Sequence, residues 1–162
     1  MIIGIDFDRV LFDTESFKDD ISDDIPGFLD HYRKNRSRYQ TKPAAEDIPV
    51  QLSVLESALQ NLESYLIEDV QALADSEHVF VIVSRGPQWF QRQKITNSNI
   101  TTYIPRYIIV DTEPKDMANI DLLIDDSMDE LNRISIPSFH FERHQHSVRS
   151  ILSLLDTNDN KE

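Results

Sequence analysis

Several residue types are scarce in this chain of 162 residues, and each scarcity removes a class of function. There is no cysteine, which excludes disulfides, thiolate zinc sites and cysteine nucleophiles, so catalysis must use carboxylates, hydroxyls, histidine or lysine. Only 16 basic residues stand against 29 acidic ones. The net charge of −13 argues against a protein that binds the phosphate backbone of a nucleic acid polymer or an anionic membrane surface.

Long apolar runs are also missing: none approaches the roughly 18 residues of a transmembrane helix. The first apolar run begins without a charged leader and a cleavable apolar segment, so we expect a cytoplasmic protein. The length fits one domain, or one domain with a small insertion, and allows a substantial core. We expect the polar tail over residues 157–162 to fray.

The order of the apolar segments predicts an α/β fold. Five short apolar runs are typical of buried strands, and they cover residues 1–7, 78–84, 106–111, 120–126 and 135–141. Helical patterns separate the later runs, including a final amphipathic helix over residues 144–155. Strands that alternate with helices indicate a Rossmann-like, three-layer parallel sheet covered on both faces.

The segment between the first two strands is too long for a simple crossover. Residues 14–40 contain helical fragments, and residues 41–49 look like a connector. Apolar residues at spacings of three and four then predict one long amphipathic helix through about residue 74: Leu55, Ala58, Leu59, Leu62, Leu66, Val70 and Leu73. We therefore expect a small helical cap with its connecting helix over residues 13–75, inserted into a core formed by residues 1–12 and 76–156.

Two carboxylates, Asp6 and Asp8, end the first apolar run. Residues two apart in a strand point the same way, so these acids converge on one spot, which is unfavourable without a cation between them. A hard divalent cation suits this place because it takes oxygen ligands and keeps positions for phosphate oxygens. The pattern predicts a Mg²⁺-dependent phosphoryl-transfer site. The alternative is an ordinary strand that ends in a solvated acidic turn.

Polar residues also follow the other expected strands. Ser84 ends the second strand, Lys115 follows the third, and Asp125 and Asp126 end the fourth. Ligands of parallel sheets bind beyond the carboxyl ends of the strands, so these side chains should meet at one edge. Their types suit phosphoryl transfer, which uses carboxylates for attack, proton transfer and metal binding, and a hydroxyl and an ammonium to hold phosphate oxygens.

The ordered set DFDRVLFDT, VFVIVS, Lys115 and LLIDD resembles the four signatures of the haloacid dehalogenase (HAD) superfamily of phosphohydrolases. A phosphoacceptor receiver domain has the same residue types in another order, and the position of Lys115 before the last acids favours the phosphohydrolase. The close spacing from Lys115 to LLIDD looks most like the 5′(3′)-deoxyribonucleotidase branch. That branch has a helical cap directly after the first signature.

The resemblance implies a role for each residue. Asp6 would be the nucleophile that becomes an aspartyl phosphate, and Asp8 the general acid and base. Mg²⁺ would be bound by Asp6, the backbone carbonyl of Asp8, and Asp125. Ser84 and Lys115 would hold the transferring phosphoryl group.

Two further residues, Asp126 and Arg9, lie next to these signature residues in the sequence. Asp126 matches the second acid of the last signature and is expected just outside the metal ligands. Arg9 stands where the family usually has glycine, so it should alter the turn or reach over the site as a further phosphate-binding residue. The sequence predicts a phosphomonoester hydrolase for a small phosphorylated metabolite, with a nucleoside monophosphate as the first candidate. The alternative is a catalytically impaired ligand-binding or interaction protein of the same fold, and Arg9 is the feature in its favour.

Three further groups of residues have a structural and a functional interpretation. Four basic residues of the expected cap either form a solvated helix face or meet a substrate phosphate: Arg33, Lys34, Arg36 and Arg38. Three aromatic residues either pack a core or line the cap side of a pocket: Phe17, Phe28 and Tyr32. Three histidines lack the carboxylate pattern that would favour a metal site: His140, His144 and His146.

Overall fold

The computed structural model describes residues 1–159 and is built on a five-stranded, fully parallel sheet. The strands are β1 (Ile2–Ile5), β2 (Val79–Arg85), β3 (Tyr107–Val110), β4 (Leu122–Asp125) and β5 (Ser138–His140). Their order is β3-β2-β1-β4-β5, which makes β1 the central strand. The predicted α/β fold with a parallel sheet is confirmed.

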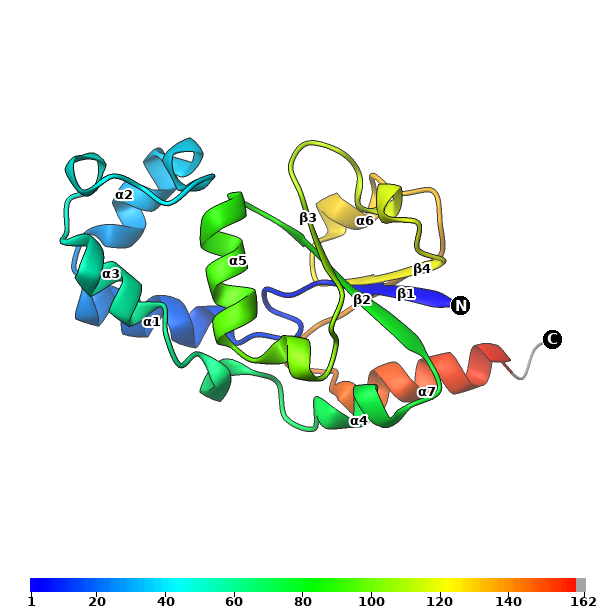
Figure 1. The fold of residues 1–162 in the computed structure, drawn as a ribbon. Helices are drawn as coiled ribbons and strands as arrows, with labels where there is room; N and C mark the ends of the chain where they lie inside the picture. Colours follow the sequence, from blue (N-terminus) through cyan, green and yellow to red (C-terminus); the bar gives the residue numbers. More distant parts are fainter. Residues whose placement is uncertain (160–162) are drawn as a thin grey trace.

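Helices cover both faces of this sheet. The α-helices of the described residues are α1 (Thr14–Asp24), α2 (Phe28–Lys34), α3 (Leu52–Ala58), α4 (Gln71–Asp75), α5 (Gln88–Asn97), α6 (Met128–Leu131) and α7 (Val148–Asp159). Short 3₁₀ helices connect them: η1 (Arg36–Tyr39), η2 (Ala45–Asp47), η3 (Glu63–Tyr65), η4 (Ile100–Thr102) and η5 (Lys115–Ala118). Figure 1 shows α4 and α7 on one side of the sheet and α6 on the other.

Each face of the sheet has its own apolar cluster, because successive strand residues point to opposite sides. Phe80 and Ile82 join the larger cluster, whereas Val81 and Val83 join the smaller one. On the side of the smaller cluster, a Cβ atom at Gly4 would overlap the Cδ1 atom of Ile120. A larger residue at position 4 would therefore force the Ile120 side chain to move.

The long helix predicted through about residue 74 is wrong. The chain instead forms α3, η3 and α4, with left-handed residues between them at Asn61 (φ 54°) and Asp69 (φ 61°). The intervening segment runs beside the chain that follows β1, where the amide of Ile67 donates to the carbonyl of Leu11 at 2.8 Å. Leu55, Leu59, Leu62 and Leu73 are nevertheless buried, because several short turns present the same apolar face that one helix would. The backbone pairing of this segment with the chain after β1 therefore replaces the continuous helix that the local pattern predicts.

The inserted helices lie beyond the carboxyl end of the sheet. Figure 1 shows α1, α2 and α3 grouped beyond α5, on the side toward which β1 runs from the N-terminus. Their buried side chains, including Phe17, Phe28 and Leu55, belong to the same apolar cluster as Ile5 of β1 and Phe90 of α5. This shared core holds the cap helices against the functional edge of the sheet.

The last helix is displaced from its expected position. It was expected over residues 144–155, whereas α7 begins at Val148 and continues through Asp159. The first part of the polar tail is thus helical, and residues 160–162 lie outside the described part of the chain. Within residues 1–159, no helix is long and apolar enough to cross a membrane.

Candidate active site

A lysine between two aspartates forms the centre of the candidate site. Asp6 follows β1 and Asp125 ends β4, and the two strands are neighbours, with the amide of Asp6 donating to the carbonyl of Ile124 at 2.9 Å. Nζ of Lys115 lies 3.0 Å from Oδ1 of Asp6 and 2.6 Å from Oδ2 of Asp125. The exposed fractions of Asp6, Lys115 and Asp125 are 6%, 2% and 0%. The structure thus brings together three residues from three separate signatures.

The electrostatics of this centre show a shortage of positive charge. Burial raises the pKa of Asp6 well above its ordinary value, and the charge of Asp125 adds to the effect, although Lys115 opposes it. Burial likewise raises the pKa of Asp125. The two carboxylates in turn raise the pKa of Lys115 despite its burial. One ammonium compensates these acids only in part.

Asp126 adds a third carboxylate to the same place. One carboxylate oxygen from each of Asp6, Asp125 and Asp126 lies within 4.8 Å of the others. Oxygen donors at this spacing suit a hard divalent cation, which would supply the missing positive charge. The residues therefore fit a metal ion. Asp126 was expected outside the ligand set, and the structure places it among the candidate ligands.

Asp8 has a different environment, made by three polar partners. Its Oδ1 atom accepts from Nζ of Lys94 at 2.7 Å and from the hydroxyl of Thr14 at 2.9 Å, and its Oδ2 atom accepts from Nε2 of Gln91 at 2.6 Å. Burial alone would raise the pKa of Asp8, but Lys94 and the two hydrogen bonds hold it below its ordinary value. Asp8 is therefore held as a carboxylate.

Lys94 is a residue that sequence analysis missed. It is 5% exposed, and its ammonium lies 5.6–6.0 Å from the ring centres of Phe7, Phe12, Phe17 and Phe90. The buried residues of α5 are Phe90, Gln91, Lys94 and Ile95. Helical spacing thus places two polar residues on an otherwise apolar inward face, which is the signal that could have singled out Gln91 and Lys94.

Ser84 lies at the end of β2 but is not presented to the pocket. It is 1% exposed, and its hydroxyl accepts from Nε2 of Gln91 at 2.6 Å. The same Gln91 nitrogen contacts Asp8, so the amide group lies between Ser84 and Asp8. Gln91 therefore separates the Ser84 hydroxyl from the pocket.

Arg9 adopts the backbone conformation that glycine usually provides. Its φ of 63° is left-handed, and its amide donates to the carbonyl of Phe12 and the hydroxyl of Thr14, each at 3.0 Å. A non-glycine residue in this region costs about 1–2 kcal/mol. Nε of Arg9 donates to Glu15 of α1 at 2.8 Å, and Arg9 lines the pocket. The turn is thus kept in its left-handed form, with Arg9 tied to the cap.

A second ion pair holds the loop that carries Lys115. Nε of Arg85 lies 3.0 Å from both carboxylate oxygens of Glu130, and the Arg85 guanidinium also donates to the carbonyls of Asp111 and Glu113. Glu130 belongs to α6, and the hydroxyl of Ser127 caps the N-terminus of this helix by accepting from the amide of Glu130 at 3.3 Å. Nothing in the sequence pattern indicated that Arg85 positions the loop that carries Lys115.

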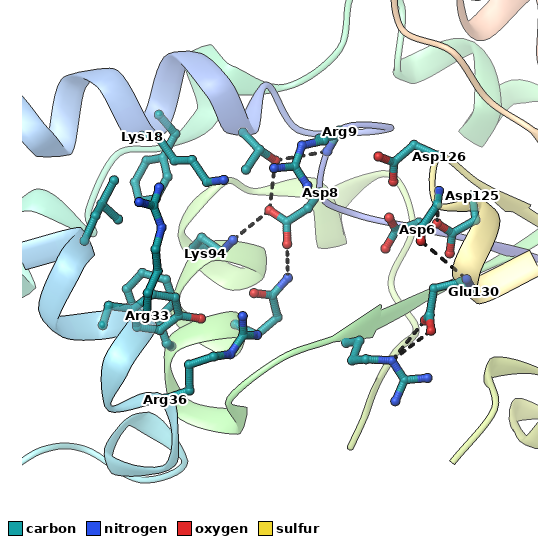
Figure 2. Close-up of a pocket in the computed structure, with 18 of the residues that line it drawn as sticks. Asp6, Asp8, Arg9, Lys18, Arg33, Arg36, Lys94, Asp125, Asp126 and Glu130 are labelled. Atoms are coloured by element: carbon teal, nitrogen blue, oxygen red, sulfur yellow. Dashed lines mark hydrogen bonds and ion pairs between the residues drawn. The ribbon is translucent and has the colours of Figure 1, made fainter. Parts of the chain in front are cut away.

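A pocket of about 460 Å³ lies between these acids and the cap, and its lining includes Asp6, Asp8 and Lys115. Figure 2 shows Asp6, Asp125 and Asp126 on one side of it, with Lys18, Arg33 and Arg36 of the cap region on the other. Of the three aromatic residues considered above, Phe17 and Tyr32 line the pocket, whereas Phe28 is fully buried. The volume suits a small molecule.

The histidines do not gather into a metal site. Nε2 of His140 lies 2.9 Å from the carbonyl of Asp126, and Nδ1 of His146 accepts from the amide of Glu142 at 2.9 Å. Within residues 1–159, the one cluster of potential metal ligands is that of Asp6, Asp125 and Asp126.

Comparison with known proteins supports the fold. No family model matches the sequence, and no curated protein sequence matches it either. A haloacid dehalogenase-like family hydrolase from Xanthomonas campestris matches at a TM-score of 0.56 and 17% identity, covering 91% of this chain and 85% of the other. A haloacid dehalogenase-like hydrolase from Burkholderia xenovorans matches at a TM-score of 0.55 and 15% identity, covering 80% and 74%.

The L-2-haloacid dehalogenase from Xanthobacter autotrophicus, with chloropropionic acid covalently bound, matches at a TM-score of 0.52 and 14% identity, covering 96% of this chain and 82% of the other. These likenesses show that the chain has the fold of HAD-like hydrolases. At such low identity they establish the architecture and leave the reaction to be argued from the site.

Proposed function

We propose that the protein is a Mg²⁺-dependent phosphomonoester hydrolase that acts on a small cytoplasmic metabolite through an aspartyl phosphate. The observation that carries this proposal is the buried Asp6–Lys115–Asp125 arrangement, with Asp126 beside it, at the edge of a small pocket. It combines a nucleophile, a cation for phosphate oxygens and a set of oxygen donors for a metal ion.

The candidate ligands for Mg²⁺ are Asp6, Asp125 and Asp126, and the resemblance adds the backbone carbonyl of Asp8. When bound, the ion would neutralise phosphate oxygens and lower the repulsion between an anionic ester and the acids of the site. Lys115 supplies a second positive charge next to Asp6 and Asp125.

In the proposed reaction, Asp6 is the nucleophile and Asp8 transfers protons. A carboxylate oxygen of Asp6 attacks phosphorus, the bond from phosphorus to the alcohol oxygen breaks, and an aspartyl phosphate forms. In its protonated form Asp8 gives its proton to the departing alcohol oxygen and becomes a carboxylate. That carboxylate then accepts a proton from the water that attacks the intermediate, which restores the protonated form for the next turnover. Because Lys94 holds Asp8 as a carboxylate, the structure favours the base role most directly.

The resemblance of the sequence to the 5′(3′)-deoxyribonucleotidase branch suggests a nucleoside monophosphate as the first substrate to test. The test is a phosphatase screen over a panel of small phosphomonoesters with Mg²⁺, with EDTA, and with the Asp6→Asn protein. We expect phosphate release in the first condition alone. Hydrolysis that survives EDTA or the substitution would contradict the proposal.

A second candidate is a hydrolytic dehalogenase, because one structural neighbour is an L-2-haloacid dehalogenase with chloropropionic acid covalently bound. Displacement of halide by a carboxylate needs no divalent cation, whereas three clustered acids with one lysine suit a cation, so we rank this second. Including 2-chloropropionate in the panel decides between the two reactions by halide release. Substrate binding without any turnover would instead support the catalytically impaired alternative.

A further inference from the structure

Two arginines of the cap face the pocket, whereas their basic neighbours do not. Arg33 and Arg36 are three residues apart and both line the pocket. Lys34 instead lies 3.0 Å from Asp30 on the exposed side of α2, and Arg38 donates to the carbonyl of Asp47. The structure thus divides the basic run of the sequence into two residues for the pocket and two for the surface.

Arg33 and Arg36 have no acidic partner in the part of the chain that the structure describes. Four other cations that line the same pocket are engaged: Arg9 with Glu15, Arg85 with Glu130, Lys94 with Asp8, and Lys115 with Asp6 and Asp125. In a chain with 29 acidic residues, two guanidinium groups left unpaired over a pocket are available for an anion from outside.

Arg36 is held in a defined place. Its guanidinium carbon lies 5.5 Å from the ring centre of Tyr32, and its Nη2 atom is 3.8 Å from where a Cβ atom of Gly86 would be. It therefore reaches from the cap to the turn that follows Ser84. The ring of Tyr32 also packs 4.4 Å from that of Phe90, so Arg36 and Phe90 both occupy space around it. This wall of the pocket presents positive charge rather than an open aromatic face.

Lys18 of α1 adds a third positive charge on the same side. Its nearest acid, Glu15, is 4.0 Å away, and the pKa of Lys18 is lowered first by partial burial and then by the charges of Arg9 and Arg33. Figure 2 shows Lys18, Arg33 and Arg36 together across the pocket from Asp6 and Asp126. The pocket is therefore polarised, with acids at the core end and cations at the cap end.

We propose that Lys18, Arg33 and Arg36 form a second anion-binding subsite, so that the substrate is a small phosphomonoester with a second phosphate or carboxylate at its far end. This inference rests on the proposed function, since the phosphate that is hydrolysed lies at Asp6. Guanidinium groups bind either oxyanion through paired hydrogen bonds, so the shared chemistry is a second anionic group.

Matched ester pairs test this subsite. We would measure kcat/KM for glycerol 3-phosphate against 3-phosphoglycerate and against glycerol 1,3-bisphosphate, and for a nucleoside 5′-monophosphate against its 3′,5′-bisphosphate. We expect the wild-type protein to prefer the doubly anionic member of at least one pair by about tenfold or more, as one charge-assisted contact allows. The pairs also separate a carboxylate from a phosphate as the second group.

Substitutions locate the preference. Arg33→Gln and Arg36→Gln should each lower the ratio of kcat/KM for the doubly over the singly anionic ester by about tenfold. Arg36→Lys should retain part of it, because the charge stays while the fork geometry is lost. The matched control is Lys34→Gln, which removes the same charge next to Arg33 but outside the pocket and should leave the ratio unchanged.

Calorimetric binding of the same esters to the Asp6→Asn protein separates this inference from the proposed function. Tighter binding of the doubly anionic esters, lost in the Asp6→Asn, Arg33→Gln double variant, would support the subsite even if no ester is hydrolysed, an outcome that would overturn only the phosphatase. Equal kcat/KM and equal affinity within every pair would overturn the subsite while the phosphatase stands. An equal loss of the ratio in Lys34→Gln would also overturn it, because the effect would then follow net charge alone.

Discussion

The ammonium of Lys94 lies 2.7 Å from a carboxylate oxygen of Asp8, although the two residues are 86 positions apart in the chain. Lys94 is buried among four phenylalanine rings, and Asp8 faces the pocket. Lys94 therefore sets the charge of the residue that we assign to proton transfer.

Replacing Lys94 with methionine should shift the pH dependence of catalysis. Without the cation, burial raises the pKa of Asp8. A base must be ionised, so where hydrolysis of the aspartyl phosphate limits turnover, the acidic limb of kcat should move to higher pH, and stability should fall by about 2 kcal/mol. The measurement is a pH profile with Mg²⁺, together with thermal unfolding. Arg92→Gln, an exposed change on the same helix, is the control, and an unshifted profile in Lys94→Met would refute the role.

Asp6→Asn should abolish turnover while leaving the fold intact. The change removes the nucleophile and one metal ligand, so kcat should fall by more than about 10³-fold. Mg²⁺ should raise the unfolding temperature of the wild-type protein and raise it less in Asp6→Asn. The measurements are phosphate release and thermal unfolding with and without Mg²⁺. Full turnover in EDTA or in the variant would contradict the assignment.

The same variant should be more stable than the wild type at neutral pH when metal is absent. The folded pKa of Asp6 is raised above its unfolded value, so Asp6 favours the folded state in acid and loses that contribution as the pH rises. Asparagine carries no charge at either pH. Between about pH 5 and about pH 8, the unfolding temperature should therefore fall more in the wild type than in Asp6→Asn. Parallel curves for the two proteins would argue against a strained carboxylate at this position.

Asp8→Asn should discriminate between leaving groups. If Asp8 protonates the departing alcohol, an alkyl phosphate should slow by about 10²-fold or more, and p-nitrophenyl phosphate by much less, since its leaving group barely needs a proton. Initial rates on both esters check this. Equal losses would show that Asp8 acts through geometry or metal binding.

Substrate size should follow from the position of the cap. The pocket is about 460 Å³ and is bounded by α1 and α2 as well as by the sheet edge. Small phosphomonoesters should therefore be hydrolysed in preference to a phosphopeptide or a 5′-phosphorylated oligonucleotide, and the net charge of −13 should further repel the latter. Rates at equal concentration decide this, and preference for either large substrate would contradict the inference that the cap excludes large substrates.

The positions of the strands along the chain and the acids at their ends were predictable from the sequence. Both depend on local patterns: an apolar run long enough for a buried strand, and a polar residue where that run ends. In a parallel sheet these ends meet at one edge, so the proximity of Asp6, Lys115 and Asp125 needed little beyond the fold class. The N-terminus of α6 also depends on a local contact, since Ser127 and Glu130 are three residues apart.

Only the tertiary structure decided which partners surround these acids. The docking of α5 brought Gln91 and Lys94 to Asp8 and covered Ser84, and the orientation of α2 and η1 turned Arg33 and Arg36, but not Lys34 and Arg38, toward the pocket. The expected long helix failed for a related reason, because its middle pairs with the chain after β1. The spacing of residues along the chain indicates which of them share one face of a helix or strand. Which other residues contact that face depends on long-range packing.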